Sequence, residues 1–167
     1  MLEVKNISYK IKDRHILSPL SFTLNAGEKM LVLGPSGSGK TTLLATLAGL
    51  LRPDTGEVSY DNQSLYDQST AKMDRFRGQK LGIIFQRHHL IKPLTVLQNL
   101  RLGLSFGGKE VDEQRIKQTL QRLNLSQKAG QKASTLSMGE AQRLAVARAV
   151  IGEPQWILCD EPTSALD

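Results

Sequence analysis

The sequence predicts an α/β fold, in which short apolar strands alternate with helices. Three observations lead to this fold class. Residues 30–33 (MLVL) form an apolar run that precedes a Gly/Ser-rich loop and a leucine-rich segment with helical spacing. Residues 81–86 (LGIIFQ) and 156–159 (WILC) form two further apolar runs. Continuous runs of this length are typical of strands that are buried on both faces.

The N-terminal elements follow from periodicity. Residues 2–4 and 20–24 alternate apolar and polar side chains, as a strand with one buried face does. Residues 58–60 alternate in the same way, and Asp61-Asn62 can turn the chain back. The leucines of residues 41–51 fall at helical spacing, so the first helix is expected directly after the Gly/Ser-rich loop.

The second half of the chain is expected to hold two helices. Residues 111–123 place three apolar side chains on one face, with acids early and bases late, which suits the helix dipole. A polar loop follows at 126–135, and a second helix should run from 138 to 151. The strand at 156–160 comes last, after Pro154.

The composition is that of an ordinary globular domain of 167 residues, which excludes collagen, coiled coil and disorder. Lysine and arginine (22) exceed the acids (16), giving a net charge of +6, so the partner is expected to be anionic: a nucleotide, a nucleic acid or a lipid headgroup. The single cysteine, Cys159, excludes a disulfide framework, and the absence of a signal-peptide pattern favours the cytosol. No apolar run approaches the ~18 residues that a membrane helix needs.

Residues 34–41 match the phosphate-binding pattern G-x-x-x-x-G-K-[ST] without exception. Glycines let the backbone curl so that N–H groups point at phosphate oxygens, and the following helix adds its positive end. Lys40 is expected to reach the β- and γ-phosphates, and the Thr41 hydroxyl to hold Mg²⁺. A merely flexible Gly/Ser loop would not need the strand before it and the helix after it. The predicted nucleotide-binding residues are Gly34, Pro35, Ser36, Gly37, Ser38, Gly39, Lys40, Thr41 and Thr42.

Two acids, Asp160 and Glu161, end the last apolar strand. Beside a phosphate loop, Asp160 can hold the hydration shell of the metal and Glu161 can orient the attacking water. Acids also cap strands that have no catalytic role. The phosphate loop upstream is what favours the catalytic interpretation.

A further motif, residues 136–140 (LSMGE), separates the classes of nucleotide-binding protein. It resembles the LSGGQ or LSGGE signature of the ATP-binding cassette (ABC) ATPases. Gln86 at a strand end, QRLAVARA at 142–149 and a D-loop-like stretch at 162–167 match the same family in the same order. The signature serine and glutamate also have the spacing of a capping box, so they could be only a helix start, and the two roles need not conflict.

The resemblance implies an architecture. It comprises a P-loop NTPase (RecA-like) core with an N-terminal antiparallel β subdomain, at residues 1–86 and 153–167. A helical signature subdomain would be inserted at residues 87–152. All 167 residues would thus form one ABC ATPase domain, incomplete at its C-terminus.

The resemblance also implies a mechanism. Two subunits would close head-to-tail on two ATP molecules, and hydrolysis would reopen the pair. Glu161 and Gln86 would be catalytic, and the Mg²⁺ ion would be positioned by Thr41, Gln86 and Asp160. The residues acting on the partner's ATP would be Ser137, Gly139 and Glu140, with Asp167 in the D-loop.

The sequence departs from the family at two sites. Met138 replaces the usual third-position glycine, and a long side chain there could loosen ATP-driven closure. At the position where the family usually has an aromatic ring that stacks on adenine, this sequence has Ile11, and Tyr9 lies two residues earlier. Either Tyr9 stacks, or Ile11 gives only an apolar contact, or Tyr9 packs within the sheet.

The sequence stops at Asp167, before the switch histidine of the family. His15, His88 and His89 all precede the last strand and cannot fill that place. We therefore expect a fragment of a longer product that binds nucleotide weakly or folds marginally, and hydrolyses ATP poorly as given.

Residues 81–100 (LGIIFQRHHLIKPLTVLQNL) are similar to the subfamily that serves lipoprotein release, macrolide export and cell division. There the ATPase is a separate chain that docks on a permease-type subunit at the cytoplasmic face of the membrane. Residues 87–132 carry nine basic and three acidic side chains, which suit either docking or a solvated helical face. Arg87, Lys92 and Arg101 are the bases proposed for docking.

Two rival functions stay open from sequence. One is a soluble ABC ATPase acting on nucleic acid or the ribosome, and the other is a non-hydrolysing fragment. With only 5% aromatic residues and no zinc-type cysteine pair, direct nucleic-acid binding is not expected. The cargo, the direction of transport and the membrane partner are not encoded in this subunit.

Overall fold

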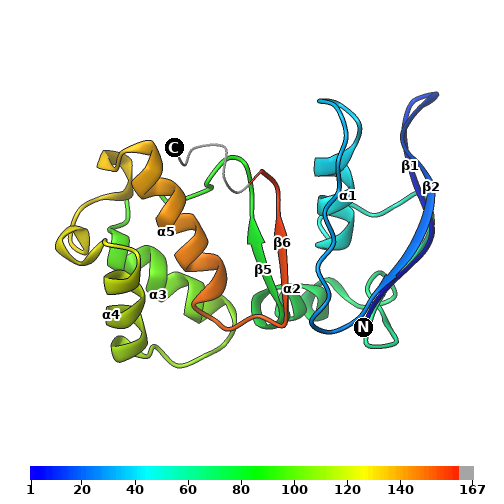
Figure 1. Ribbon diagram of the computed structural model, residues 1–167. Coiled ribbons are helices and arrows are strands. Elements are labelled where there is room, and N and C mark those ends of the chain that lie inside the picture. The colour runs from blue at the N-terminus through cyan, green and yellow to red at the C-terminus, as the bar shows by residue number, and fades with distance from the viewer. Residues whose placement is uncertain (162–167) are drawn as a thin grey trace. The chain divides into compact units, whose positions relative to one another are not determined.

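The computed structural model describes residues 1–161, which divide into two compact units, 1–73 and 74–161 (Figure 1). Asp167 and the rest of the D-loop-like stretch lie outside the described residues. Within residues 1–161, no helix combines the length and apolar character needed to cross a bilayer. The subdomain boundaries expected from the sequence stay a prediction.

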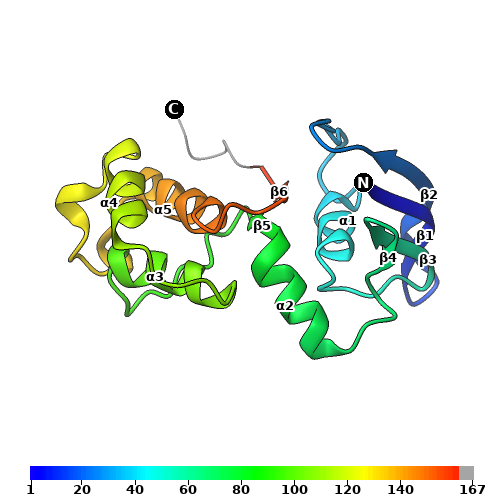
Figure 2. The same ribbon diagram turned by 90° about the horizontal axis from the view of Figure 1, so that it is seen from below.

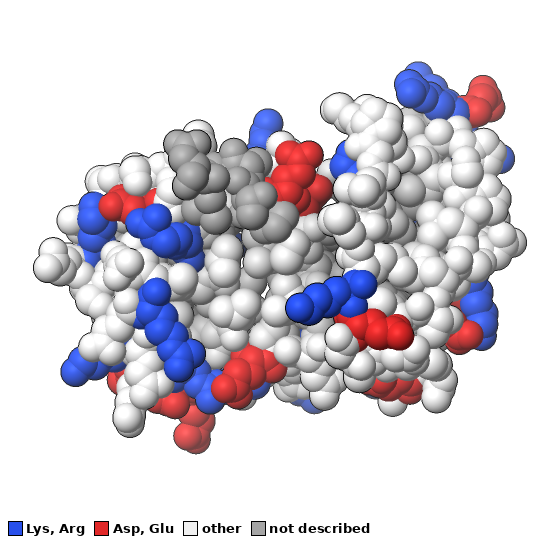
Figure 3. Space-filling model, in the orientation of Figure 1, with Lys and Arg blue, Asp and Glu red and all other residues white. Residues whose placement is uncertain are grey.

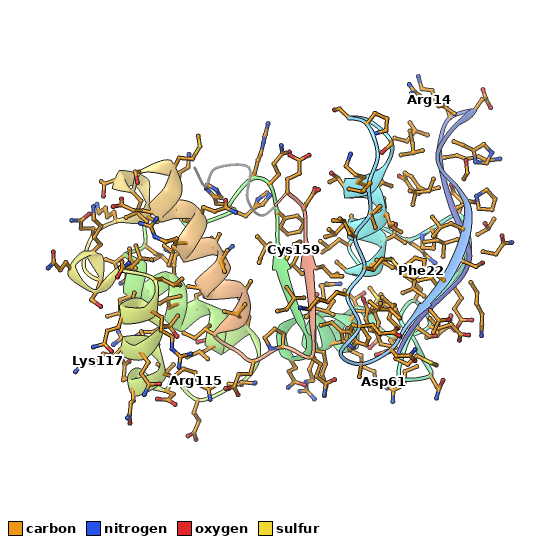
Figure 4. The ribbon with its side chains drawn as sticks, in the orientation of Figure 1. Arg14, Phe22, Asp61, Arg115, Lys117 and Cys159 are labelled. Atoms are coloured by element: carbon orange, nitrogen blue, oxygen red, sulfur yellow. The ribbon has the colours of Figure 1, made fainter. Side chains whose placement is uncertain are left out.

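The first unit is built on an antiparallel sheet with the strand order β2-β1-β3-β4. Its strands are β1 (Leu2–Ile11), β2 (Arg14–Leu24), β3 (Thr55–Tyr60) and β4 (Gln63–Ser64). Val4 on β1 lies between Phe22 on β2 and Val58 on β3, so one sheet face gathers the apolar side chains. Figure 4 labels Phe22 on β2 and Arg14 at the β1–β2 turn. The predicted alternation is confirmed.

The turn between β3 and β4 is the one expected from the sequence. Asp61 and Asn62 both have positive φ, 50° and 63°, which is the conformation that a tight hairpin turn requires. Asn and Asp tolerate that region better than most residues.

Helix α1 (Lys40–Leu47) follows the Gly/Ser-rich loop but is shorter than the predicted 41–51. Two tyrosine hydroxyls hold its C-terminal end. Tyr60 donates to the Leu47 carbonyl at 2.9 Å. The Tyr66 hydroxyl lies 2.5 and 2.6 Å from the carbonyl oxygens of Thr46 and Leu51, and its single hydrogen can be donated to either. Gly49, with φ of 67°, ends the helical path.

The strand predicted at residues 30–33 is wrong in this structure. The segment is not a strand, and Leu31 and Leu33 are 80% and 81% exposed. An apolar run favours burial, but a strand also needs a neighbouring strand that satisfies its backbone N–H and C=O groups. No described strand pairs with these residues.

The second unit combines a parallel strand pair with a helical cluster. The pair is β5 (Leu81–Ile84) and β6 (Trp156–Cys159), in register from Leu81 opposite Trp156 to Ile84 opposite Cys159. The helices are α2 (Thr70–Lys80, which begins in the first unit), α3 (Val96–Phe106), α4 (Glu113–Arg122) and α5 (Met138–Val150). Two short 3₁₀ turns, Ser126–Lys128 and Ala133–Thr135, lie in the predicted polar loop.

Helix α5 links the strands to the other helices. It packs on β5 and on α3, and both views place it between the β5–β6 pair and α4 (Figures 1 and 2). An apolar cluster forms their common core, and its most buried members are Val96, Leu100, Leu104, Ile116, Leu125, Leu144 and Ala147. The helices predicted at 111–123 and 138–151 and the strands at 81–86 and 156–160 are therefore confirmed to within a few residues.

Candidate nucleotide-binding site

The Gly/Ser-rich loop 34–39 adopts the backbone that its glycines were expected to allow. Gly37 and Gly39 have φ of 78° and 91°, a region that L side chains rarely enter. A Cβ at Gly39 would lie 2.4 Å from the Ile16 carbonyl oxygen and 3.0 Å from Leu17 Cδ2. Gly39 is thus required both by its dihedral and by its close approach to β2.

Lys40 lies within the curl of this loop. Its Nζ donates to the carbonyls of Gly34 at 2.9 Å and Pro35 at 2.8 Å. Helix α1 starts at Lys40, and the first N–H groups of a helix have no intrahelical acceptor. An ammonium group and a helix N-terminus meet at one loop, which is an arrangement suited to phosphate.

The remaining predicted nucleotide contacts also lie in the first unit. Thr41 is exposed and Thr42 is half-buried at the start of α1. On β1, Tyr9 is half-buried and Ile11 is 55% exposed. Both β1 side chains remain candidates for the adenine contact.

The parallel pairing of β5 and β6 brings two predicted catalytic residues together in the second unit. Gln86 Nε2 donates to Glu161 Oε2 at 2.9 Å. The Asp160 N–H continues the ladder by donating to the Ile84 carbonyl at 2.8 Å, and Asp160 itself is buried. Figure 4 labels Cys159 on β6, the residue before these acids. One strand tip therefore presents a buried acid and an exposed acid that is held by an amide.

The signature forms the amino-terminal end of α5 as a complete capping box, as predicted. Glu140 Oε2 accepts from the Ser137 N–H at 2.9 Å, and Ser137 Oγ accepts from the Glu140 N–H at 3.4 Å. Met138 is 70% exposed, and Gly139 is half-buried behind it. The substitution of Met for Gly therefore places a long apolar side chain on the surface without disturbing the helix start.

Lys128, which sequence reasoning did not single out, completes this end of α5. Its Nζ lies 2.7 Å from Glu140 Oε1. The hydrogen bond from Lys128, followed by the one from the Ser137 N–H, lowers the pKa of Glu140 from 4.5 to about 2. Because the folded-state pKa is depressed, the ion pair is fully formed at neutral pH and is lost only as pH falls from about 4.5 towards about 2.

Two further contacts missed from sequence organise the segment after Gln86. Arg148 on α5 donates to the carbonyls of His89 at 2.8 Å and His88 at 3.1 Å. Asn99, which is fully buried on α3, accepts from the Ile91 N–H at 3.0 Å through its Oδ1. Backbone contacts of this kind leave no local pattern that could have revealed them.

Comparison with known proteins gives a consistent result. The profile of the ABC transporter family matches residues 17–164. The lipoprotein-releasing system ATP-binding protein LolD of Idiomarina loihiensis is 38% identical over 173 residues, covering all of this chain and 76% of LolD. LolD of Porphyromonas gingivalis is 38% identical over 169 residues, covering all of this chain and 77% of that protein.

Solved structures agree in fold. The dimeric structure of MJ0796, a bacterial ABC transporter cassette, has a TM-score of 0.89 and 37% identity, over all of this chain and 76% of that one. The post-hydrolysis MJ0796 dimer bound to ADP and Pi has a TM-score of 0.91 and 35% identity, with the same coverage. The predicted α/β cassette fold is therefore confirmed, and the rival functions are not favoured. This chain belongs to the ABC transporter family, as one of its ATP-binding and ATP-hydrolysing subunits.

Proposed function

We propose that this chain powers a lipoprotein-releasing type of membrane complex from its cytoplasmic face, through ATP-driven closure of a dimer. The observation that carries the proposal is the hydrogen bond between Gln86 and Glu161. This bond connects Glu161, which would orient the attacking water, to Gln86. The segment after Gln86 leads into a large groove. A partner seated in that groove would thus act on the catalytic acid through Gln86. The two LolD relatives support the class of complex.

The groove lies within the second unit and has a volume of about 760 Å³. Its lining comes from α2, β5, α3, α5 and the segment before α3, and combines apolar and basic side chains with one acid, Asp74. It includes Arg75, Ile83, Ile91, Leu102, Phe106 and Arg148. Phe106 is 68% exposed, so its ring is accessible to a partner. We assign the groove to a short helix of the permease-type subunit, apolar on one face and acidic at its rim.

The basic charge expected to assist docking is smaller than the sequence implied. Arg101 Nε donates to Glu113 Oε1 at 2.9 Å, and Arg101 Nη2 lies 2.8 Å from the same oxygen. The charge of Arg101 is therefore neutralised within the subunit. Arg87 and Lys92, close to Gln86 in the chain, remain the bases proposed to face the membrane subunit or its headgroups.

The Phe106→Asp variant is expected to lose assembly with the membrane subunit of the same transporter, because a carboxylate in the groove cannot replace a buried ring. Assembly is measured by co-purification of the tagged chain with that subunit in detergent. Val111→Asp is the matched control, since Val111 is an exposed apolar residue that does not line the groove. ATP affinity should be unchanged in both variants. Equal assembly of the two variants would remove the groove from the proposal.

Mg²⁺ is proposed as the cation that accompanies ATP. The described residues hold no cluster of three or more His, Cys, Asp or Glu side chains. Mg²⁺ is usually held by one or two carboxylates together with substrate phosphates. The family resemblance implies Thr41, Gln86 and Asp160 as its ligands, each of which offers a hard oxygen donor. The bound ion would neutralise charge on the phosphates.

The closed state is proposed to bring a second ATPase subunit against the signature. Ser137, Gly139 and the first N–H groups of α5 would then bind the γ-phosphate held by the partner's phosphate loop. Glu161 would orient water for in-line attack. Asp167, which lies outside the described residues, is proposed to act in the D-loop, as the family resemblance implies. The dimeric MJ0796 cassette supports this arrangement.

Met138→Gly is expected to raise ATP-dependent dimerisation, because it removes an exposed side chain from the surface that must approach the partner. The gain should be several-fold in the ATP-bound dimerisation constant, measured by light scattering. Met138→Ala should give most of the gain and retains helix propensity, which separates the steric effect from backbone flexibility. Unchanged dimerisation in both variants would show that the seam tolerates Met138.

A further inference from the structure

The signature of this chain carries a charge that its proposed ligand should not tolerate. Glu140 places a carboxylate in the first turn of α5, where it stabilises the helix start. The same N-terminus is proposed to receive the γ-phosphate of the partner's ATP. A phosphate and a carboxylate repel each other, and repulsion grows as closure excludes water.

The structure places a cation against that carboxylate. Lys128 Nζ lies 2.7 Å from Glu140 Oε1, while Glu140 Oε2 accepts from the Ser137 N–H at 2.9 Å. The Glu140 side chain is only 16% exposed, and each of its oxygens has a partner. In Figure 3, acidic surface lies between basic surfaces over the amino-terminal end of α5. Lys128 belongs to a separate 3₁₀ turn, so this contact joins two segments of the helical cluster.

The serine hydroxyl beside this pair is weakly engaged. Ser137 Oγ accepts from the Glu140 N–H at 3.4 Å, at the long limit of a hydrogen bond. The Glu140 carboxylate, not the hydroxyl, therefore makes the shorter of the two capping contacts. A Ser137 hydroxyl that is not needed as the main cap can turn towards a phosphate oxygen while the helix start stays intact.

We propose that Lys128 is a positioning residue for the signature: it neutralises Glu140 and holds its carboxylate on the backbone, so that the α5 N-terminus can accept an anionic phosphate from the partner subunit. The proposal rests on the function proposed above. Within the LSGGQ or LSGGE pattern, a glutamine at the fifth position needs no counter-charge, whereas the glutamate of this chain does. The need for Lys128 should therefore disappear when Glu140 becomes glutamine.

A double-mutant cycle tests this directly. Four proteins are compared in a Glu161→Gln background, which slows hydrolysis: the parent, Lys128→Met, Glu140→Gln, and both changes together. ATP-dependent dimerisation is measured by light scattering. Lys128→Met should weaken it about ten-fold or more, since the uncompensated carboxylate then faces the phosphate. Glu140→Gln is the reference for the double variant, which should dimerise within about three-fold of Glu140→Gln alone.

Two controls separate the charge role from a structural one. Lys128→Arg keeps the charge and should dimerise as the parent does. Binding of a fluorescent ATP analogue to the monomer should be equal in all four proteins, because Lys128 is remote in sequence from the phosphate loop and belongs to the other compact unit. Thermal unfolding of each variant shows whether the fold is retained.

The outcomes are distinct. If the parent itself does not dimerise with ATP, the proposed closure is wrong and the role of Lys128 is wrong with it. If the parent dimerises and Lys128→Met is unaffected, closure stands and the inference is overturned. If Lys128→Met weakens dimerisation about ten-fold in the Glu140→Gln background too, Lys128 acts through structure and not through the charge of Glu140, which also overturns the inference.

Discussion

Glu161→Gln should reduce ATP turnover by a factor of about 10²–10⁴ while leaving nucleotide binding intact. Glutamine can still accept the hydrogen bond from Gln86 Nε2 through its amide oxygen, so the local geometry of the strand tip is preserved. It cannot act as a carboxylate towards the attacking water. Turnover is measured as phosphate release from the chain assembled with its membrane subunit, and binding with a fluorescent ATP analogue.

Gln86→Ala serves as the matched comparison for this acid. It removes the amide that holds Glu161 but leaves the carboxylate, so turnover should fall about ten-fold, far less than in Glu161→Gln. If Glu161→Gln retained more than about a tenth of wild-type turnover, another group would have to orient the water. If Gln86→Ala reduced turnover more than Glu161→Gln, Gln86 and not Glu161 would be the more important residue for hydrolysis.

Gly39→Ala should abolish tight ATP binding, the largest effect that we expect from a single methyl group. The added Cβ would lie 2.4 Å from the Ile16 carbonyl oxygen, so the loop or β2 must move. The φ of 91° adds backbone strain of about 1–3 kcal/mol to that clash. Displacing the loop would move Lys40 and the start of α1 together. Isothermal titration with ATP measures affinity, and thermal unfolding measures stability.

Gly37→Ala is the control for this prediction. Its φ of 78° imposes comparable backbone strain, but a Cβ there would meet no atom within 4 Å. It should therefore lose about 1–2 kcal/mol of stability and keep much of its ATP affinity. Equal loss of binding in the two variants would mean that the dihedral, and not the approach to β2, sets the requirement for glycine.

Most of the helices, strands and turns could be predicted from local sequence patterns. The Ser137–Glu140 capping box, the helix that it starts and the turn at Asp61-Asn62 depend on neighbours in sequence, and each was predictable. Helix α3 also has a local signal that went unused: Thr95 and Gln98 form a second capping box, with contacts of 3.1 and 2.8 Å. Helix α2 buries no residue, so it offers no apolar period to detect.

Contacts between distant segments could not be predicted in the same way. Residues 30–33 have the composition of a strand, but pairing depends on a neighbouring strand, which their own sequence cannot specify. Lys128 and Glu140 meet because two turns of the helical cluster pack together, and lysine in a polar loop gives no sign of that. The family resemblance implied catalytic roles for Gln86 and Glu161, but the hydrogen bond between them was not predicted from the sequence.

The tyrosines and the tryptophan of this chain lie in different compact units. All three tyrosines, Tyr9, Tyr60 and Tyr66, belong to residues 1–73, and the single tryptophan, Trp156, belongs to residues 74–161. Tyrosine absorbance therefore reports on the unit with the phosphate loop, and tryptophan emission on the unit with the catalytic acids. Coincident denaturation curves from the two signals would show one cooperative unit, whereas separated curves would resolve two. The unlabelled protein thus contains its own pair of optical probes.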